Sequence, residues 1–174
     1  MSGGIPVPVD IGSDNLIDPN AIEPAITSRT VGIMPTQLNG RTCKMDKIQA
    51  IAEKNNLFLV EDAAQALGSK YKNKNAGTFG HAAAISFFPA KVLGCLGDGG
   101  AILTQDPEIY NKVWQIHDHG RNFEGEVISW GRNSRLDNIQ AAILNYRLKN
   151  YNEVIKRRRE VASLYESKLS HLDE

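Results

Sequence analysis

The feature that most limits the fold of this chain is an alternation of strand and helix patterns in its first half. Short apolar runs at residues 31–34 and 57–60 predict two buried strands. Between them, residues 46–55 place apolar side chains at helical spacing, and Asp46 is the predicted cap of that helix. Because a helix that joins two strands returns the chain in the same direction, the pattern predicts a parallel sheet with right-handed crossovers.

The next two strands are expected to run in opposite directions. Residues 82–88 predict one strand and residues 101–104 the next, and only a glycine-rich loop separates them. A connection without a helix favours antiparallel pairing. The residues therefore predict an α/β fold, with a mixed, mostly parallel sheet that is flanked by helices.

Three helices are predicted after the last strand. Asp106 predicts the cap of a helix over residues 106–117. Ser134 predicts a capping-box-like start for residues 134–148, and residues 151–172 predict a further amphipathic helix. The remaining predictions are an extended edge segment over residues 5–10, a helical spacing within residues 14–28 and a long loop over residues 119–131.

Charge and composition argue against several classes of partner. Lys and Arg together number 20, as do Asp and Glu, so the formal net charge is zero and gives no electrostatic support for nucleic acid or an anionic membrane. The basic run at residues 156–159 fits the solvated face of a helix better than a nucleic-acid patch. No apolar run is long enough to cross a bilayer, and the N-terminus lacks the layout of a signal peptide.

The cysteines and histidines predict no metal or disulfide chemistry. Cys43 and Cys95 form neither a paired-ligand motif nor a disulfide framework, which predicts reduced thiols in a cytoplasmic protein and no nucleophile. His117 and His119 have no third ligand at a suitable spacing, so no metal site is predicted.

Lys91 has the most distinctive surroundings of any charged residue in the chain. It follows an apolar strand and precedes the glycine-rich run at residues 97–100, a layout that places an amine on the floor of a pocket. A desolvated lysine amine can attack a carbonyl, as a Schiff base requires. A surface lysine in a hairpin loop explains the same stretch equally well.

Asp62 and Gln65 stand where the second strand ends, which is the edge at which open α/β sheets bind ligands. Residues 61–68 predict the start of a helix, in which small residues such as Ala64 let a flat ring approach the backbone. A carboxylate there can keep a ring nitrogen protonated, and an amide can donate to a ring substituent, which a pyridinium electron sink needs. The plain alternative is a helix cap at Asp62.

Two further residues suggest an anion site. Ser86 ends the strand that leads to Lys91, and its hydroxyl could donate to a phosphate, although an inward serine bonded to backbone is equally common. Asn133 stands in a loop just before a predicted helix N-terminus, where it could reach an anion, or it is a turn asparagine. The glycines within residues 94–100 match no nucleotide-binding motif and predict only room for the backbone.

In their order along the chain, these stretches resemble the DegT-type (DegT/DnrJ/StrS) sugar aminotransferases. That family consists of pyridoxal-phosphate enzymes of fold type I, with an aspartate-aminotransferase-like large domain. The resemblance runs from Ile5 nearly to the C-terminus. It is carried by Val60–Gly68, Ser86–Lys91, Gly97–Ala101, His119–Arg121, and Asn133–Asp137 with Gln140–Ile143.

The resemblance implies roles for six residues. Lys91 would form the Schiff base with pyridoxal phosphate and move the proton between substrate carbon and cofactor. Asn133 would reach the phosphate of the neighbouring subunit's cofactor, which implies a homodimer with shared active sites. The other implied cofactor contacts are Asp62 with the pyridine nitrogen, Ala64 with a ring face, Gln65 with the ring hydroxyl and Ser86 with the phosphate.

The function that the resemblance implies is transfer of an amino group from glutamate to a keto group of a nucleotide-linked (di)deoxy sugar. Lysine at position 91 argues against the dehydratase branch, which has histidine there. The rival hypothesis is a truncated, non-catalytic fold-type-I fragment that serves as a binding or assembly module. A lysine-based aldolase without the cofactor leaves Asp62 and Gln65 without a role.

The resemblance also implies a truncated chain. The family normally has an N-terminal segment with a further phosphate site and an aromatic residue over the ring, and a second, smaller domain at its C-terminal end. Residues 1–150 are therefore expected to form the core of the cofactor-binding large domain. Residues 151–174 are expected to form a helix that leads toward the small domain.

Overall fold

The computed structural model describes residues 3–172, which divide into two compact units. The first unit holds the residues up to Ser86 together with Gly100–Arg135. The second holds Phe87–Gly99 and the residues from Leu136 onward. Among the described residues, no helix combines the length and the apolar character that a membrane span requires.

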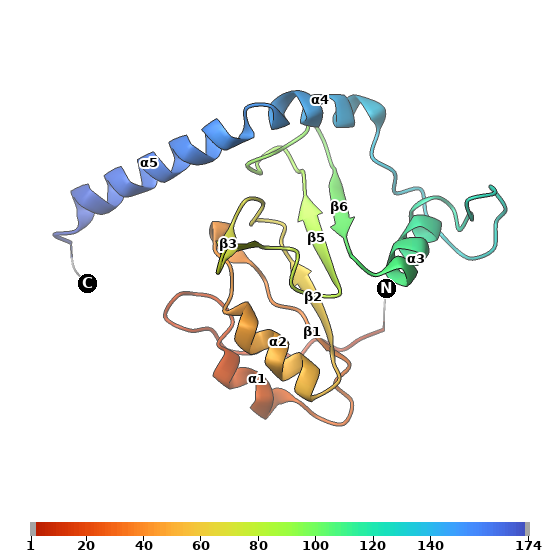
Figure 1. Ribbon diagram of the computed structural model, residues 1–174, viewed down its shortest axis with the longest axis horizontal. Coiled ribbons are helices and arrows are strands. Elements are labelled where there is room, and N and C mark those ends of the chain that lie inside the picture. Colours follow the sequence, from red (N-terminus) through yellow and green to blue (C-terminus); the bar gives the residue numbers. More distant parts are fainter. Residues whose placement is uncertain (1–2, 173–174) are drawn as a thin grey trace. The chain divides into compact units, whose positions relative to one another are not determined.

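A four-stranded mixed sheet organises the first unit (Figure 1). The strand order is β1-β2-β5-β6, in which β1 pairs parallel with β2, β2 pairs parallel with β5, and β5 pairs antiparallel with β6. This confirms the predicted mixed sheet and the antiparallel last pair. The strands span Gly32–Ile33 (β1), Phe58–Asp62 (β2), Ala82–Ser86 (β5) and Gly100–Leu103 (β6).

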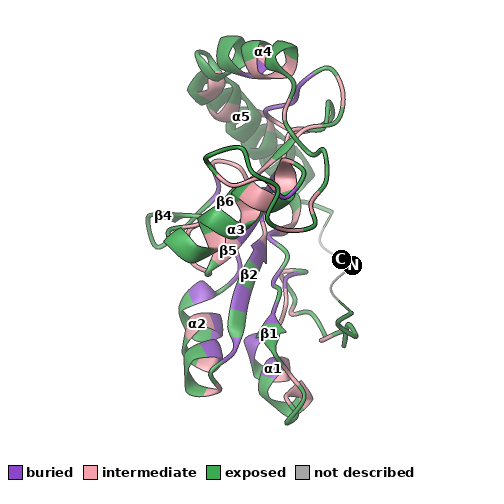
Figure 2. Ribbon diagram, turned by 90° about the vertical axis from the view of Figure 1, so that its right-hand side faces the viewer, coloured by how far each residue is buried: buried purple, intermediate pink, exposed green. Residues whose placement is uncertain are grey.

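The hydrophobic core lies where two helices, α1 (Pro19–Ala25) and α2 (Met45–Lys54), pack on the sheet. Side chains alternate along β2, so that Leu59 is buried and its neighbours Phe58 and Val60 are exposed. The buried stripe along β2 and the buried side of α2 are visible in Figure 2. The core cluster consists of Leu16, Ile22, Ile33, Cys43, Met45, Ile48, Ala52, Leu57 and Leu59.

Three local predictions in this unit are wrong. The first strand is not buried throughout, because Val31 and Met34 are 76% and 69% exposed and β1 is a two-residue strand at the end of the sheet order. Helix α2 begins at Met45, so Asp46 lies in its first turn and does not cap it. Residues 5–10 form no strand, and the only ladder contact nearby among the described residues is a single bridge between Ile11 and Ile17.

The connection from β2 to β5 contains structure that the sequence patterns did not indicate. A short hairpin joins β3 (Lys70–Tyr71) to β4 (Lys74–Asn75). Both turn residues, Lys72 and Asn73, have positive φ (47° and 66°), as the tightest antiparallel hairpins require. The loop before α2 contains a short 3₁₀ turn, η1 (Leu38–Gly40).

Helix α3 (Pro107–His117) begins as predicted, because the Asp106 carboxylate accepts hydrogen bonds from the backbone N–H groups of Glu108 (2.8 Å) and Ile109 (3.3 Å). The predicted loop that follows forms two antiparallel bridges, of which the outer one joins Asp118 to Asn133. Gly120, at φ +78°, is required there, since a Cβ would lie 1.7 Å from a backbone oxygen of the same loop.

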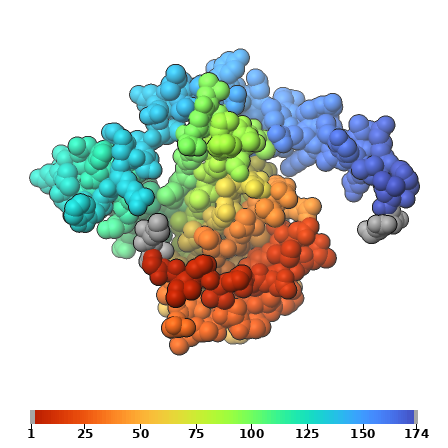
Figure 3. All heavy atoms as spheres, turned by 180° about the vertical axis from the view of Figure 1, so that it is seen from behind, coloured from red at the N-terminus to blue at the C-terminus, as the bar shows by residue number. Residues whose placement is uncertain are grey.

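The second unit contains helices α4 (Asn138–Leu148) and α5 (Tyr151–Leu169). The predicted capping box at Ser134 is wrong, because α4 begins at Asn138 and the residues before it are extended. Helix α5 is present as predicted, but it has no buried residue. Its atoms stand at the surface along the length of the helix in the space-filling view, where α5 is blue (Figure 3).

Candidate functional site

Asp62 and Ser86 lie at the carboxyl ends of two neighbouring parallel strands. The register pairs Asp62 with Ala84 across β2 and β5, and Ser86 is two residues farther along β5. Because side chains alternate along a strand, Asp62, Ala84 and Ser86 share one face of the sheet. The fold therefore brings two of the predicted site residues to the edge at which α/β sheets bind ligands.

Asp62 is held by its backbone and retains bonding capacity in its side chain. Its N–H donates to the carbonyl of Pro35 (3.0 Å), and its carbonyl accepts from the N–H of Gln37 (2.8 Å). Its Oδ1 accepts from the N–H of Ala64 (3.1 Å). This last bond closes a turn, so the helix predicted after Asp62 is wrong, and the carboxylate caps a turn instead.

Gln65 is exposed, and the backbone of η1 determines how its amide is oriented. Its Oε1 accepts from the N–H of Asn39 (3.1 Å), and its own carbonyl accepts from the N–H of Gly40 (3.0 Å). A backbone N–H can donate only to the amide oxygen, so the NH₂ group of Gln65 is left for another partner. Ala64, between the two polar residues, is half-buried.

Two residues beneath this turn, Glu61 and Gln37, were not singled out from the sequence. Both are fully buried, and Gln37 Nε2 donates to Glu61 Oε2 at 2.8 Å. The sequence did hold a signal for Glu61. Side chains alternate along a strand, and Glu61 falls on the same inward side as Leu57 and Leu59. A buried carboxylate must be paired or hydrogen-bonded, which marks it as part of a network.

Lys91 belongs to the second unit, whereas the other five predicted site residues belong to the first. It is half-buried, and its backbone N–H donates to the carbonyl of Phe88 (2.8 Å). Its amine takes part in none of the ion pairs found among residues 3–172. Gly94 follows in the same loop, and a Cβ there would lie 2.8 Å from the Phe88 carbonyl oxygen. This confirms that the glycine provides room for the backbone.

Helix α4 supports the glycine-rich loop within the second unit. Gln140 Oε1 accepts from the backbone N–H of Leu96 at 2.8 Å. The guanidinium of Arg147 donates to the carbonyl of Gly94. The sequence contained Gln140 in one of the matching stretches, but its spacing alone did not indicate this role.

Asn133 is exposed and lies five residues before α4 begins, so it does not directly precede a helix N-terminus. Its Oδ1 accepts from Arg135 Nε (3.2 Å), and its backbone bridges to Asp118. The Asp118 carboxylate lies 3.2 Å from the Arg135 guanidinium, which ties both sides of the loop together. The structure thus places Asn133 on a loop that is pinned by these contacts.

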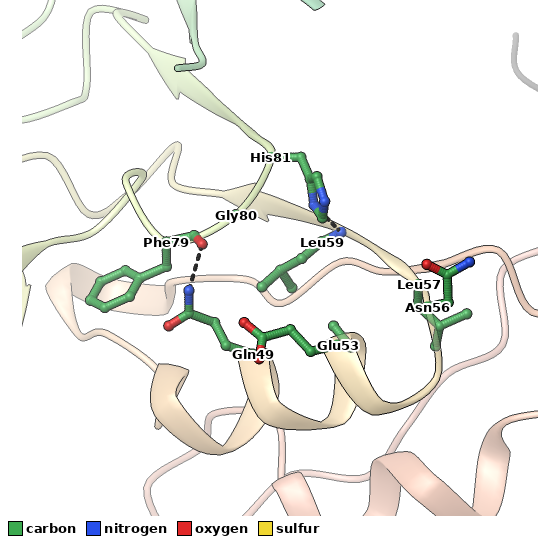
Figure 4. Close-up of a pocket in the computed structure, with 9 residues that line it drawn as sticks. Gln49, Glu53, Asn56, Leu57, Leu59, Phe79, Gly80 and His81 are labelled. Carbon is green, nitrogen blue, oxygen red and sulfur yellow. Dashed lines mark hydrogen bonds between the residues drawn. The ribbon is translucent and has the colours of Figure 1, made fainter. Parts of the chain in front are cut away.

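A pocket of about 460 Å³ opens at the opposite end of the sheet, near the start of β2 and β5 (Figure 4). Two of its polar side chains bond to backbone, since Gln49 donates to the Phe79 carbonyl (2.8 Å) and His81 Nδ1 accepts from the N–H of Leu59 (3.1 Å). None of the predicted site residues lines this pocket. In the described part of the chain, no group of three His, Cys, Asp or Glu side chains could hold a metal ion.

Comparisons with known proteins agree with the resemblance. The chain is 44% identical over 173 residues to the UDP-2-acetamido-2-deoxy-3-oxo-D-glucuronate aminotransferase of Pseudomonas aeruginosa. The matched region covers 99% of this chain and 48% of that protein. The solved structure of DesV from S. venezuelae, in complex with a ketimine intermediate, is 40% identical with a TM-score of 0.92. That match covers 97% of this chain and 46% of that one.

A second solved structure, ntda from Bacillus subtilis with bound cofactor PMP, is 37% identical with a TM-score of 0.86, over 98% of this chain and 39% of that one. The chain thus spans about half the length of the curated relatives it matches. These structures confirm the predicted fold, a mixed, mostly parallel sheet of the aspartate-aminotransferase type. The family model matches residues 1–174 in full, and the chain therefore belongs to the DegT/DnrJ/EryC1/StrS aminotransferase family.

Proposed function

We propose that this protein is a pyridoxal-phosphate-dependent aminotransferase that moves an amino group from glutamate to the keto group of a nucleotide-linked deoxy sugar. The observation that carries the proposal is the placement of Asp62 and Ser86 at adjacent strand ends, on one face of the sheet. The amide donor of Gln65 follows in the same turn. The name of the P. aeruginosa relative, an aminotransferase for a 3-oxo sugar nucleotide, supports the substrate class.

The residues of the first unit fit this cofactor. Asp62 commits Oδ1 to the N–H of Ala64, and its second oxygen suits a protonated ring nitrogen. Gln65 commits its oxygen to Asn39 and presents an NH₂ donor that suits a ring hydroxyl oxygen. Ala64 would pack on a ring face, and the hydroxyl of Ser86 would donate to the phosphate.

When bound, pyridoxal phosphate supplies a sink for the electron pair released at the substrate carbon. Asp62 would stabilise the protonated ring nitrogen, which makes that sink stronger. Lys91 would attach the cofactor through Nζ and would then move the proton at the substrate carbon as general base and general acid.

Three further assignments belong to this proposal. Asn133, on its pinned and exposed loop, would reach the cofactor phosphate of a second copy, so the working form is a homodimer. Residues 1–150 would form the cofactor-binding core, and residues 151–174 would lead toward a smaller domain. Cytoplasmic localisation is supported by Cys43 and Cys95, which are buried free thiols.

The first test is covalent labelling of Lys91. Pyridoxal phosphate and borohydride should attach the cofactor to Lys91, which peptide mass spectrometry locates. Lys91→Ala should lose the label, whereas Lys112→Ala, at an exposed position on α3, should keep it. A label that persists at full yield in Lys91→Ala contradicts the proposal.

The second test concerns the reaction and the shared site. Glutamate labelled with ¹⁵N should transfer its nitrogen to a nucleotide-linked keto sugar. Mixing Lys91→Ala with Asn133→Ala protein should restore activity to about a quarter of wild type, because half of the dimers then carry one complete site. A protein that binds the cofactor at Lys91 but transfers no nitrogen would favour the rival function, a binding or assembly module.

A further inference from the structure

We propose that the buried pair of Glu61 and Gln37 is a positioning device, which aims the Gln65 amide by fixing the loop that contains η1. The inference rests on the proposed function, since it gives the purpose for which Gln65 is aimed. Neither residue touches the face on which Asp62 and Ser86 lie, so both act through the residues that they hold. They are positioning residues and not catalytic ones.

The first step is that both carboxylate oxygens of Glu61 accept two hydrogen bonds each. Its Oε1 accepts from the N–H groups of Phe79 (2.6 Å) and Gly80 (2.9 Å). Its Oε2 accepts from the N–H of Gly77 (2.8 Å) and from Gln37 Nε2 (2.8 Å). Four donors converge on one fully buried carboxylate, an arrangement that strengthens each bond in a low dielectric. Three of the donors are backbone, so the carboxylate is a fixed point of the fold.

The second step is the link from Glu61 to the loop that contains η1, and the side chain of Gln37 makes this link. While its Nε2 donates to Glu61, its Oε1 accepts from the N–H of Cys43 (2.7 Å). One side chain thereby closes residues 37–43 into a loop. The backbone N–H of Gln37 also donates to the carbonyl of Asp62 (2.8 Å), so the loop is tied to the end of β2.

The third step is that two backbone N–H groups of this loop donate hydrogen bonds to Gln65. Asn39 and Gly40 are consecutive residues with positive φ, at 54° and 75°. Asparagine and glycine are the residue types that adopt this left-handed conformation most readily, so the sequence suits the turn that the closed loop holds. As a result the N–H of Asn39 meets Gln65 Oε1 and the N–H of Gly40 meets the Gln65 carbonyl.

The consequence is a fixed choice between two amide orientations. With its oxygen bonded to Asn39, Gln65 presents only its donor, which suits the ring hydroxyl oxygen of the cofactor. If the loop relaxes, the amide is free to turn over and present its acceptor instead. Loss of the Gln37 contacts is therefore expected to weaken cofactor binding even though Asp62, Gln65 and Lys91 are all present.

The test uses Gln37→Met, which keeps the length of the side chain, removes its hydrogen bonds to Glu61, Cys43 and Met45, and leaves the three backbone donors on Glu61. Amide hydrogen exchange at Asn39 and Gly40 should accelerate about tenfold or more, and the dissociation constant for pyridoxal phosphate should rise about tenfold. The control is Asn55→Leu, which removes a side-chain bond to the Ile51 carbonyl (2.8 Å) at the end of α2, outside the Glu61 network, and should change neither quantity.

A double-mutant cycle separates positioning from general destabilisation. In the Gln65→Ala background, Gln37→Met should cost no further affinity for pyridoxal phosphate, because there is no amide left to aim. A full, additive loss in that background would overturn the inference, as would unchanged exchange at Asn39 and Gly40.

A measurement on the wild type keeps the inference testable if Gln37→Met fails to fold. A scalar coupling across the hydrogen bond from Asn39 N to Gln65 Cδ should be detectable by NMR in the protein without cofactor, and its absence would overturn the inference. If the wild type binds no pyridoxal phosphate, the proposed function fails, whereas exchange and coupling still decide whether the loop is held.

Discussion

Helices α2 and α5 both place apolar side chains at helical spacing, yet they meet very different surroundings. In α2, Ile48 is completely buried, and in α5, Leu164 and Tyr165 are 53% and 65% exposed. Helix α2 packs on β2 within the core cluster, whereas α5 has no buried residue. The comparison teaches that spacing predicts a helix, while burial depends on a second surface that the helix itself does not provide.

The strongest test of this comparison is a matched pair of truncations. Ile48→Ala should lower the free energy of unfolding by about 2–5 kcal/mol, because it leaves a cavity in a packed core. Leu164→Ala should change it by less than about 0.5 kcal/mol, since Leu164 is 53% exposed and lies on a helix without a buried residue. Urea unfolding of both variants measures the difference. An equally large loss for Leu164→Ala would mean that α5 is covered in solution.

Cys43 lies in the same core as Ile48, and it offers a second test of how well this core is buried, with a smaller expected effect on stability. Burial raises the pKa of the Cys43 thiol from 9.0 to about 11. Because the folded pKa is the higher one, the thiol's contribution to stability is fully present below pH 9 and is lost as the pH rises through about 11.

The native protein is therefore expected to resist alkylation at Cys43 at pH 8, and to react rapidly once urea unfolds it. In addition, the stability lost between pH 8 and pH 10.5 should be smaller in Cys43→Ala than in the wild type. Rapid alkylation of Cys43 in the native state would show that this part of the core opens readily, and would weaken the contrast with α5.

The smallest effect is expected on the outer side of α2, where Asp46 is exposed. It accepts hydrogen bonds from Lys72 Nζ (2.7 Å) and the Tyr71 hydroxyl (2.8 Å). The bond from Lys72, followed by that from Tyr71, lowers the pKa of Asp46 from 3.8 to about 2. The contribution to stability is thus present above pH 3.8 and is lost as the pH falls through about 2.

Asp46→Asn should leave the unfolding midpoint at pH 7 nearly unchanged, as is usual for exposed ion pairs. An NMR titration of the wild type should place the Asp46 pKa below the usual aspartate range, and Lys72→Ala should move it back. A large loss of stability in Asp46→Asn would show that the hairpin depends on this surface contact, and that burial is not the main difference between the two helices.

Several elements were predictable because their causes are local. The cap of α3 depends on Asp106 and the residues directly after it, so adjacent chemistry was sufficient. The antiparallel pairing of β5 with β6 follows from a connection that contains no helix. The failures at Ser134 and after Asp62 have one cause, because in both places a residue suited to capping was assumed to be followed by a helix.

By itself, the sequence determined the four strands of the main sheet in their order and the positions of Asp62 and Ser86 at strand ends, since these depend on residue type and spacing. The family followed from the resemblance of whole stretches of the sequence. Only the tertiary structure decided which groups meet. Glu61 could be assigned an inward direction from its phase, but its four donors come from Gln37 and from the loop before β5. A buried carboxylate is stable only where distant backbone groups converge on it, and such convergence is a property of the fold that local spacing does not contain.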